Sequence, residues 1–177
     1  MQRRRPRPPE TAPDARGAAP PSPYRPPPQQ PWRFIYASVY AMLLVLLVLV
    51  FMLGTSLSAD VHALTVQALQ SHLAIGLAFS GGIHWGVGLR YTATTARIPV
   101  FHFIWGLLLA YLGWGVVLIA PPAISLVLLA LLHLWSHLVD RRVWPGAGLG
   151  PWLHLRLHYT VAAITICLAG AGLLAMQ

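Results

Sequence analysis

Twenty consecutive residues, from Phe34 to Leu53, carry no charged side chain. As a helix rising about 1.5 Å per residue, such a segment is about 30 Å long, which matches the hydrocarbon core of a bilayer. A cleaved secretory leader would instead have a shorter apolar core close to its first charges and a small-residue cleavage site. The run at 34–53 therefore predicts a membrane-spanning helix that stays in the protein.

Four further apolar segments follow, at 71–89, 100–120, 123–139 and 153–176. The pair Pro121 and Pro122 separates the third from the fourth, and a glycine- and proline-rich stretch ending at Trp152 separates the fourth from the fifth. Only 9% of the residues are charged, against about a quarter in soluble domains. We expect an all-α, polytopic membrane protein with one domain at 32–177, a bundle of five transmembrane helices.

Residues 1–31 are rich in proline and arginine and contain almost no aliphatic side chains. Such a segment buries too little apolar surface to offset its ordering entropy, so we expect a disordered cytoplasmic tail with local polyproline II conformation. Its simplest role is to help set the membrane orientation. Docking to a proline-binding partner and attraction to anionic lipid are the alternatives.

The positive charges are unevenly placed, and all twelve belong to arginine. In a five-helix arrangement every one of them falls on the side of the N-terminal tail, as expected for the cytoplasmic side. The absence of lysine suggests a bacterial source. We therefore expect a protein of the bacterial cytoplasmic (inner) membrane with a cytoplasmic N-terminus and a periplasmic C-terminus. Because the net charge of +8 is concentrated in the tail, we expect no nucleic-acid partner. The arginines are Arg3, Arg4, Arg5, Arg7, Arg16, Arg25, Arg33, Arg90, Arg97, Arg141, Arg142 and Arg156.

The second expected helix is rich in small residues, and Gly82 and Gly86 form a GxxxG pair. Membrane helices pack through close backbone approach at small residues. We expect this face to bind another helix, either within the chain, in a membrane protein partner or in a second copy of the chain. A close approach to a ligand or lipid headgroup, with His84 and Trp85 at its edge, is the alternative.

Three motifs together carry a family resemblance: GGIHWG in the second helix, Asp140–Arg142, and PWLHLRLHYT at the start of the last helix. Over residues 70–176 the chain resembles the bacterial and mitochondrial membrane family called domain of unknown function 3429, which includes transmembrane protein 69. The resemblance implies a compact five-helix membrane domain and no established activity. The positions that match the family pattern are Gly81, Gly82, Trp85, Gly86, Asp140, Arg141 and Arg156.

Six of the eight histidines are expected near the cytoplasmic ends of the helices, and ionisable groups inside a membrane are functional candidates. Two i, i+4 pairs, in HLWSH and HLRLH, could together hold copper, iron or zinc. Alternatively, one histidine from each of two helices, His84 and His133, could ligate haem b. The remaining interpretation is that the rings sit in the headgroup zone or join helices by hydrogen bonds. The six are His84, His102, His133, His137, His154 and His158.

Asp140 and Arg156 flank the last loop, and we expect them to pair and fix the register of the two final helices. Arg141, Arg142 and Arg156 could instead hold an anionic lipid headgroup or a quinone-like substrate. The sequence shows no catalytic triad, phosphate loop or nucleotide fingerprint. We therefore expect a small non-enzymatic accessory subunit, assembly factor or scaffold of a membrane complex. A haem- or metal-binding electron carrier is the alternative.

Overall fold

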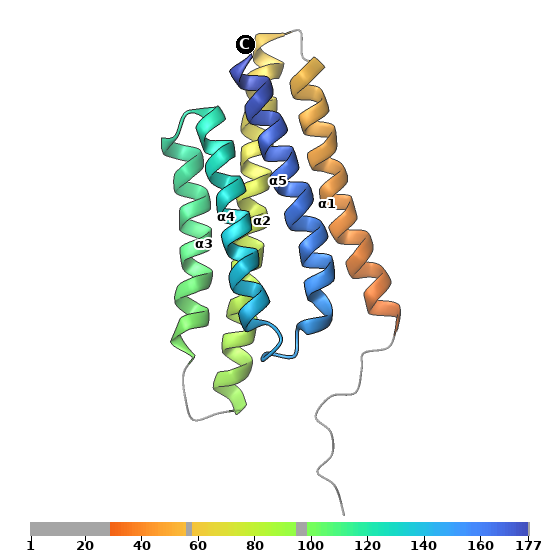
Figure 1. Cartoon of the computed structure of the whole chain (residues 1–177), viewed down its shortest axis with the longest axis vertical. Coiled ribbons are helices and arrows are strands. Elements are labelled where there is room, and N and C mark those ends of the chain that lie inside the picture. Colours follow the sequence, from red (N-terminus) through yellow and green to blue (C-terminus); the bar gives the residue numbers. More distant parts are fainter. Residues whose placement is uncertain (1–28, 56–57, 95–98, 177) are drawn as a thin grey trace, which may run out of the picture.

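The structure, a computed structural model, describes residues 29–55, 58–94 and 99–176. Five long helices run up and down in one bundle (Figure 1). A short 3₁₀ turn at Gly150–Trp152 precedes the last of them. Most of the expected disordered tail, residues 1–28, lies outside the described residues. The helices are α1 (Gln29–Thr55), α2 (Ala59–Thr94), α3 (Val100–Ile119), α4 (Pro122–Val143) and α5 (Leu153–Ala175).

Two proline- and glycine-containing turns set the ends of α4. Pro121 precedes α4 in an extended conformation, and Pro122 takes the first helical position, where a backbone N–H would be unpaired in any case. Ala120, the residue before this pair, is also extended and ends α3, as expected before a proline. In the loop after α4, Gly148 has a positive φ of 76°, a conformation that glycine adopts without steric cost.

Three of the helices, α1, α2 and α4, extend beyond the expected spans. α2 begins at Ala59 instead of 71 and ends at Thr94 instead of 89. Its first three turns mix polar and apolar residues, most of which tolerate a helix, and Asp60 is favourably placed at the N-terminal end of the helix dipole. α1 begins at Gln29 instead of 34, and α4 continues to Val143 instead of 139. The expected boundaries followed hydropathy, which marks the apolar part of a helix and misses its polar ends.

Four of the described helical segments are long and apolar enough to cross a membrane: Trp32–Thr55, Val100–Ile119, Pro122–Val143 and Gly150–Ala175. α2 is the longest helix at 36 residues, but its small and polar residues dilute its apolar character. It nevertheless lies alongside the other helices and extends past α3 and α4 at the lower end of the bundle (Figure 1). The expected all-α, five-helix membrane fold is confirmed, with four helices that meet the length and composition of a span.

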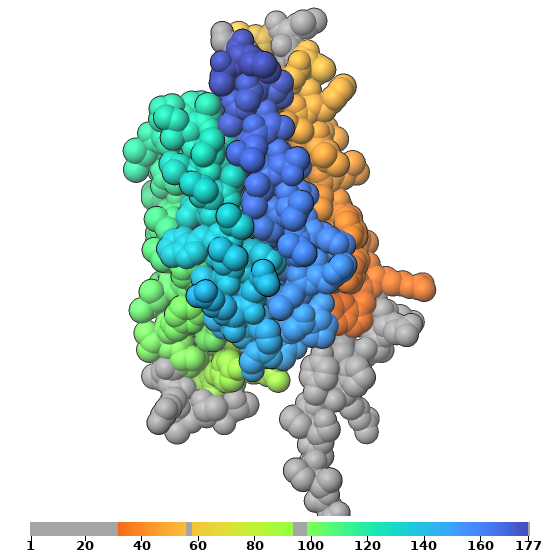
Figure 2. All heavy atoms as spheres, viewed as in Figure 1, coloured from red at the N-terminus to blue at the C-terminus, as the bar shows by residue number. Residues whose placement is uncertain are grey.

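The core contains a column of leucines without solvent exposure, among them Leu46, Leu73, Leu109 and Leu129. The exterior is also apolar, and large side chains such as Phe51 and Ile119 are 69% and 86% exposed. In the view of Figure 2, α5 lies between α4 and α1 on this exterior. An apolar surface of this extent is costly in water, and it fits a surrounding of lipid chains.

α2 and α3 approach closely at two glycines. A Cβ atom on Gly81 would overlap the backbone oxygen of Gly106, and one on Gly106 would overlap the ring of Trp85. The Trp85 indole N–H donates to the Phe103 carbonyl over 3.1 Å. At Gly81, the small residue of α2 therefore allows close packing against α3 within the chain. Small residues commonly have this role where membrane helices meet.

Candidate functional site

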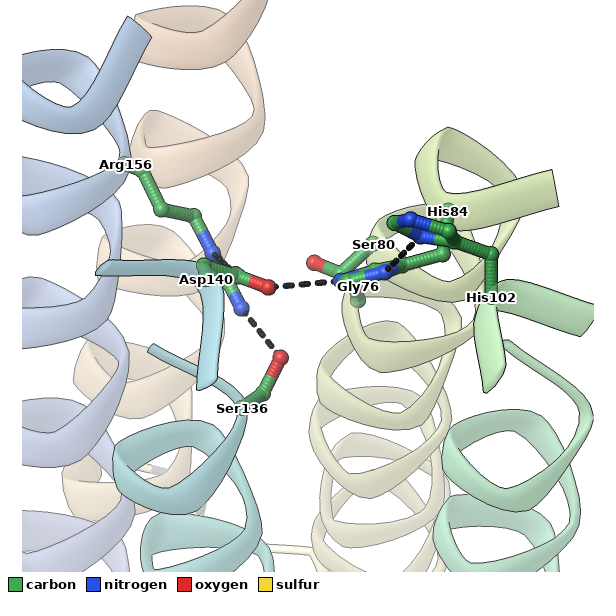
Figure 3. A network of polar contacts seen from close by, with 7 residues as sticks. All are labelled: Gly76, Ser80, His84, His102, Ser136, Asp140 and Arg156. Atoms are coloured by element: carbon green, nitrogen blue, oxygen red, sulfur yellow. Dashed lines mark hydrogen bonds and ion pairs between the residues drawn. The ribbon is translucent and has the colours of Figure 1, made fainter. Parts of the chain in front are cut away.

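A buried polar network lies near the end of the bundle that carries the α4–α5 loop, and Asp140 is at its centre. The Asp140 side chain is 0% exposed. One carboxylate oxygen accepts a hydrogen bond from His84 Nε2 at 2.8 Å, and the other accepts from Arg156 Nε, also at 2.8 Å. The network thus joins α2, α4 and α5 through one carboxylate (Figure 3).

Two further side chains complete this network. Arg156 Nη2 donates to the Ser136 hydroxyl at 2.7 Å, and Ser136 lies one helical turn before Asp140 on the same face of α4. On the other side, His84 Nδ1 lies 3.1 Å from His102 Nδ1, so α3 is included as well. We call His84, His102, Ser136, Asp140 and Arg156 the Asp140 network.

Within the Asp140 network, the opposite charges of Asp140 and Arg156 form a pair. An isolated buried charge is strongly unfavourable, whereas the Asp140 carboxylate and the Arg156 guanidinium neutralise each other at hydrogen-bond distance. With the Asp140 carboxylate ionised, His84 Nε2 must carry a proton. The two facing Nδ1 atoms then share one proton, which can belong to either His84 or His102. The arrangement can therefore hold a proton between two histidines beside a fixed carboxylate.

The predicted pairing of Asp140 with Arg156 is present. The other predicted polar residues at this end, Arg141 and Arg142, lie on the exposed side of the last turn of α4. They border a shallow hollow with Trp135, Leu138 and Val139.

The structure brings together only some of the predicted histidines. His84 and His102 meet, but His133 is engaged elsewhere, with its Nε2 3.2 Å from the Leu73 carbonyl oxygen. His137 is buried in α4. His154 and His158 contact each other, with ring centroids 4.3 Å apart.

The two i, i+4 pairs have different surroundings, because His158 Nδ1 lies 3.0 Å from the Tyr40 hydroxyl of α1, whereas His133 and His137 are buried. Within residues 29–55, 58–94 and 99–176, no three His, Cys, Asp or Glu side chains are gathered as for a metal ion. The four-histidine arrangement and the pairing of His84 with His133 thus remain sequence-based hypotheses without an assembled site in the described chain.

A cavity of about 510 Å³ adjoins the Asp140 network between α1, α2, α5 and the α4–α5 loop. Arg156 lies in the wall of the cavity as well as in the network. Neither the cavity nor the contact between His84 and His102 was predicted. Hydropathy and spacing assign residues to a helix and a face, and they do not state which faces of separate helices meet. The i, i+4 spacing of Ser136 and Asp140 was a signal that could have added Ser136.

A family model described as "Protein of unknown function (DUF3429)" matches residues 27–172. The chain belongs to this family. The match begins before α1, so it includes the first helix, which the motif resemblance over residues 70–176 did not reach. No curated protein and no solved structure matches the chain. Membership is consistent with the helical membrane fold and assigns no activity.

Proposed function

We propose that this protein is a non-enzymatic accessory or scaffolding component of a membrane complex. In this proposal α2 crosses the bilayer with the other four helices, and the arginine-bearing end faces the cytoplasm of a bacterial cell. Support for this orientation comes from the positions of Arg33, Arg141 and Arg156 near helix ends on the same side of an up-and-down bundle.

The observation that carries the proposal is an open small-residue face on α2. A Cβ atom added to Gly82 or Gly86 would meet no atom within 4 Å, whereas the neighbouring Gly81 is closed by α3. The predicted GxxxG pair is therefore not used within the described part of the chain. Large apolar side chains extend the same face in both directions, since Phe79 is 62% and Leu89 is 59% exposed.

A GxxxG pair on an outward face is suited to a second helix, because the missing side chains let two backbones approach closely. Spacings of three and four residues place Ile75, Phe79, Gly82, Gly86 and Leu89 on one stripe. A lipid-facing helix has no need of two glycines one turn apart, each of which lowers helix propensity by about 1 kcal/mol relative to alanine. The stripe thus fits a protein partner or a second copy of this chain.

The test is native purification from membranes in mild detergent, followed by mass spectrometry of the intact assembly. We expect a stoichiometric partner or a homo-oligomer, and we expect the double variant Gly82→Ile with Gly86→Ile to lose it. Gly172→Ile in α5 is the matched control, since that glycine is equally open. A monomer without partners, or an assembly that the double variant leaves intact, would contradict the proposal.

One contact favours the alternative, a metal- or haem-binding electron carrier: two buried histidines from different helices, His84 and His102, face each other. Imidazole nitrogens suit zinc, copper and iron. The measurement is a visible absorption spectrum with metal analysis of the purified protein. A Soret band or stoichiometric metal that disappears in His102→Ala would support the carrier, and a colourless, metal-free protein would exclude it.

A further inference from the structure

The cavity beside the Asp140 network has the size and lining of a binding site for a small lipophilic molecule. Its volume of about 510 Å³ falls in the range of about 300–1,000 Å³ that is common for ligand pockets. Its wall includes the apolar side chains of Ile35, Val39 and Met42 from α1 and of Phe79 and Ile83 from α2. An apolar molecule that enters it would lose little by leaving the bilayer.

Two residues of the same wall hold hydrogen-bond donors that are buried just behind the apolar lining and that the protein leaves unused. The Trp144 indole N–H and the Tyr159 hydroxyl are buried without a partner among the described residues, although both residues line the cavity. The Tyr159 hydroxyl lies against Gly76, another wall residue, where a Cβ atom would overlap it. Buried donors are normally satisfied, so two unpaired ones beside a cavity suggest a missing acceptor.

Arg156 adds a third donor. Its Nε and Nη2 atoms are bonded to Asp140 and Ser136, and no bond to the described residues uses Nη1. Asp140 already balances the charge of this guanidinium. A further full negative charge would therefore have to be buried without a counter-charge of its own, which is unfavourable in a low-dielectric site. A neutral carbonyl or hydroxyl oxygen accepts from such donors without that cost.

We propose that this cavity binds a membrane-soluble molecule with a neutral oxygen-bearing head and an apolar tail. The head accepts hydrogen bonds from Trp144, Tyr159 and Arg156 after small side-chain shifts, and the tail lies along α1 and α2. Isoprenoid quinones and neutral acyl-ester lipids share this chemistry. This binding is a proposal separate from assembly with a partner, and the two share one residue, Phe79, which belongs both to the cavity wall and to the stripe on α2.

The experiment uses the full-length protein in mild detergent and three probes: decylubiquinone, dioleoylglycerol and the anionic dioleoylphosphatidylglycerol. After incubation and repurification, bound probe is quantified by mass spectrometry over a concentration series. We expect one of the two neutral probes to bind with one-to-one stoichiometry, and which of them binds identifies the source. Binding of neither neutral probe, or preference for the anionic lipid, would overturn the proposal.

Two sets of variants locate the binding. Tyr159→Phe with Trp144→Phe removes two donors while keeping an aromatic ring at each position, and we expect about a tenfold loss of affinity. The control, Tyr111→Phe with Trp114→Phe, makes the same chemical changes at exposed positions of α3 and should bind like the unmodified protein. Val39→Phe, which fills the cavity, should abolish binding. Equal binding by all variants would place the probe elsewhere and overturn the proposal.

Discussion

The carboxylate of Asp140 is the central group of the buried Asp140 network. It is fully buried and joins three other helices to α4, directly through His84 and Arg156 and indirectly through His102. Part of this was predictable, because Asp140 and Arg156 flank a short loop and carry opposite charges. The role of His84 was not, because its contact with Asp140 spans 56 residues of sequence and depends on how α2 packs against α4.

Asp140→Asn should destabilise the fold by removing the counter-charge of Arg156. Breaking a buried ion pair from one side typically costs about 3–5 kcal/mol, since the remaining charge stays buried without compensation. The measurement is the midpoint of thermal unfolding in detergent, monitored by circular dichroism. Arg141→Gln, an exposed change one residue further along α4, is the control. An Asp140→Asn protein as stable as this control would show that the pair contributes little.

At the level of the helices, the small residues of α2 divide into two faces with different tasks. Gly81 is closed by the backbone of Gly106, whereas Gly82, its neighbour in sequence, is open. The sequence predicted a small-residue interface on this helix and left open what it binds. The spacing of residues along the sequence gives the angle of each residue around its own helix. The side of α2 on which α3 lies depends on how all five helices pack.

Gly81→Ala and Gly82→Ala should therefore have opposite outcomes although both raise helix propensity. The Gly81 methyl would overlap a backbone oxygen, which cannot rotate away, so α2 and α3 must separate and the unfolding midpoint should fall. The Gly82 methyl meets open space and should leave the midpoint unchanged or slightly higher. Thermal unfolding of the two purified variants side by side checks this. A lower midpoint for Gly82→Ala alone would reverse the assignment of the two faces.

At the level of the whole molecule, the succession of apolar segments and turns predicted the five helices and their up-and-down order. Hydropathy succeeded because each turn between the last three helices is marked by proline or glycine. It missed the first three turns of α2, where polar and apolar residues are mixed. It could not show the cavity, because the cavity forms between side chains of α1, α2, α5 and the α4–α5 loop, and their packing is not encoded in hydropathy.

The central claim is a five-helix membrane bundle whose arginine-bearing end faces the cytoplasm. This claim requires that α2 crosses the membrane. Single cysteines at Ser58, Gly146 and Met176 can be introduced into a Cys167→Ala background, because Cys167 is the only native cysteine. Labelling of spheroplasts with a membrane-impermeant maleimide then reports the side of each position. We predict that Ser58→Cys and Met176→Cys are labelled from outside and that Gly146→Cys is labelled only after lysis. Labelling of Ser58→Cys and Gly146→Cys from the same side would show that α2 does not cross the membrane and would contradict the account.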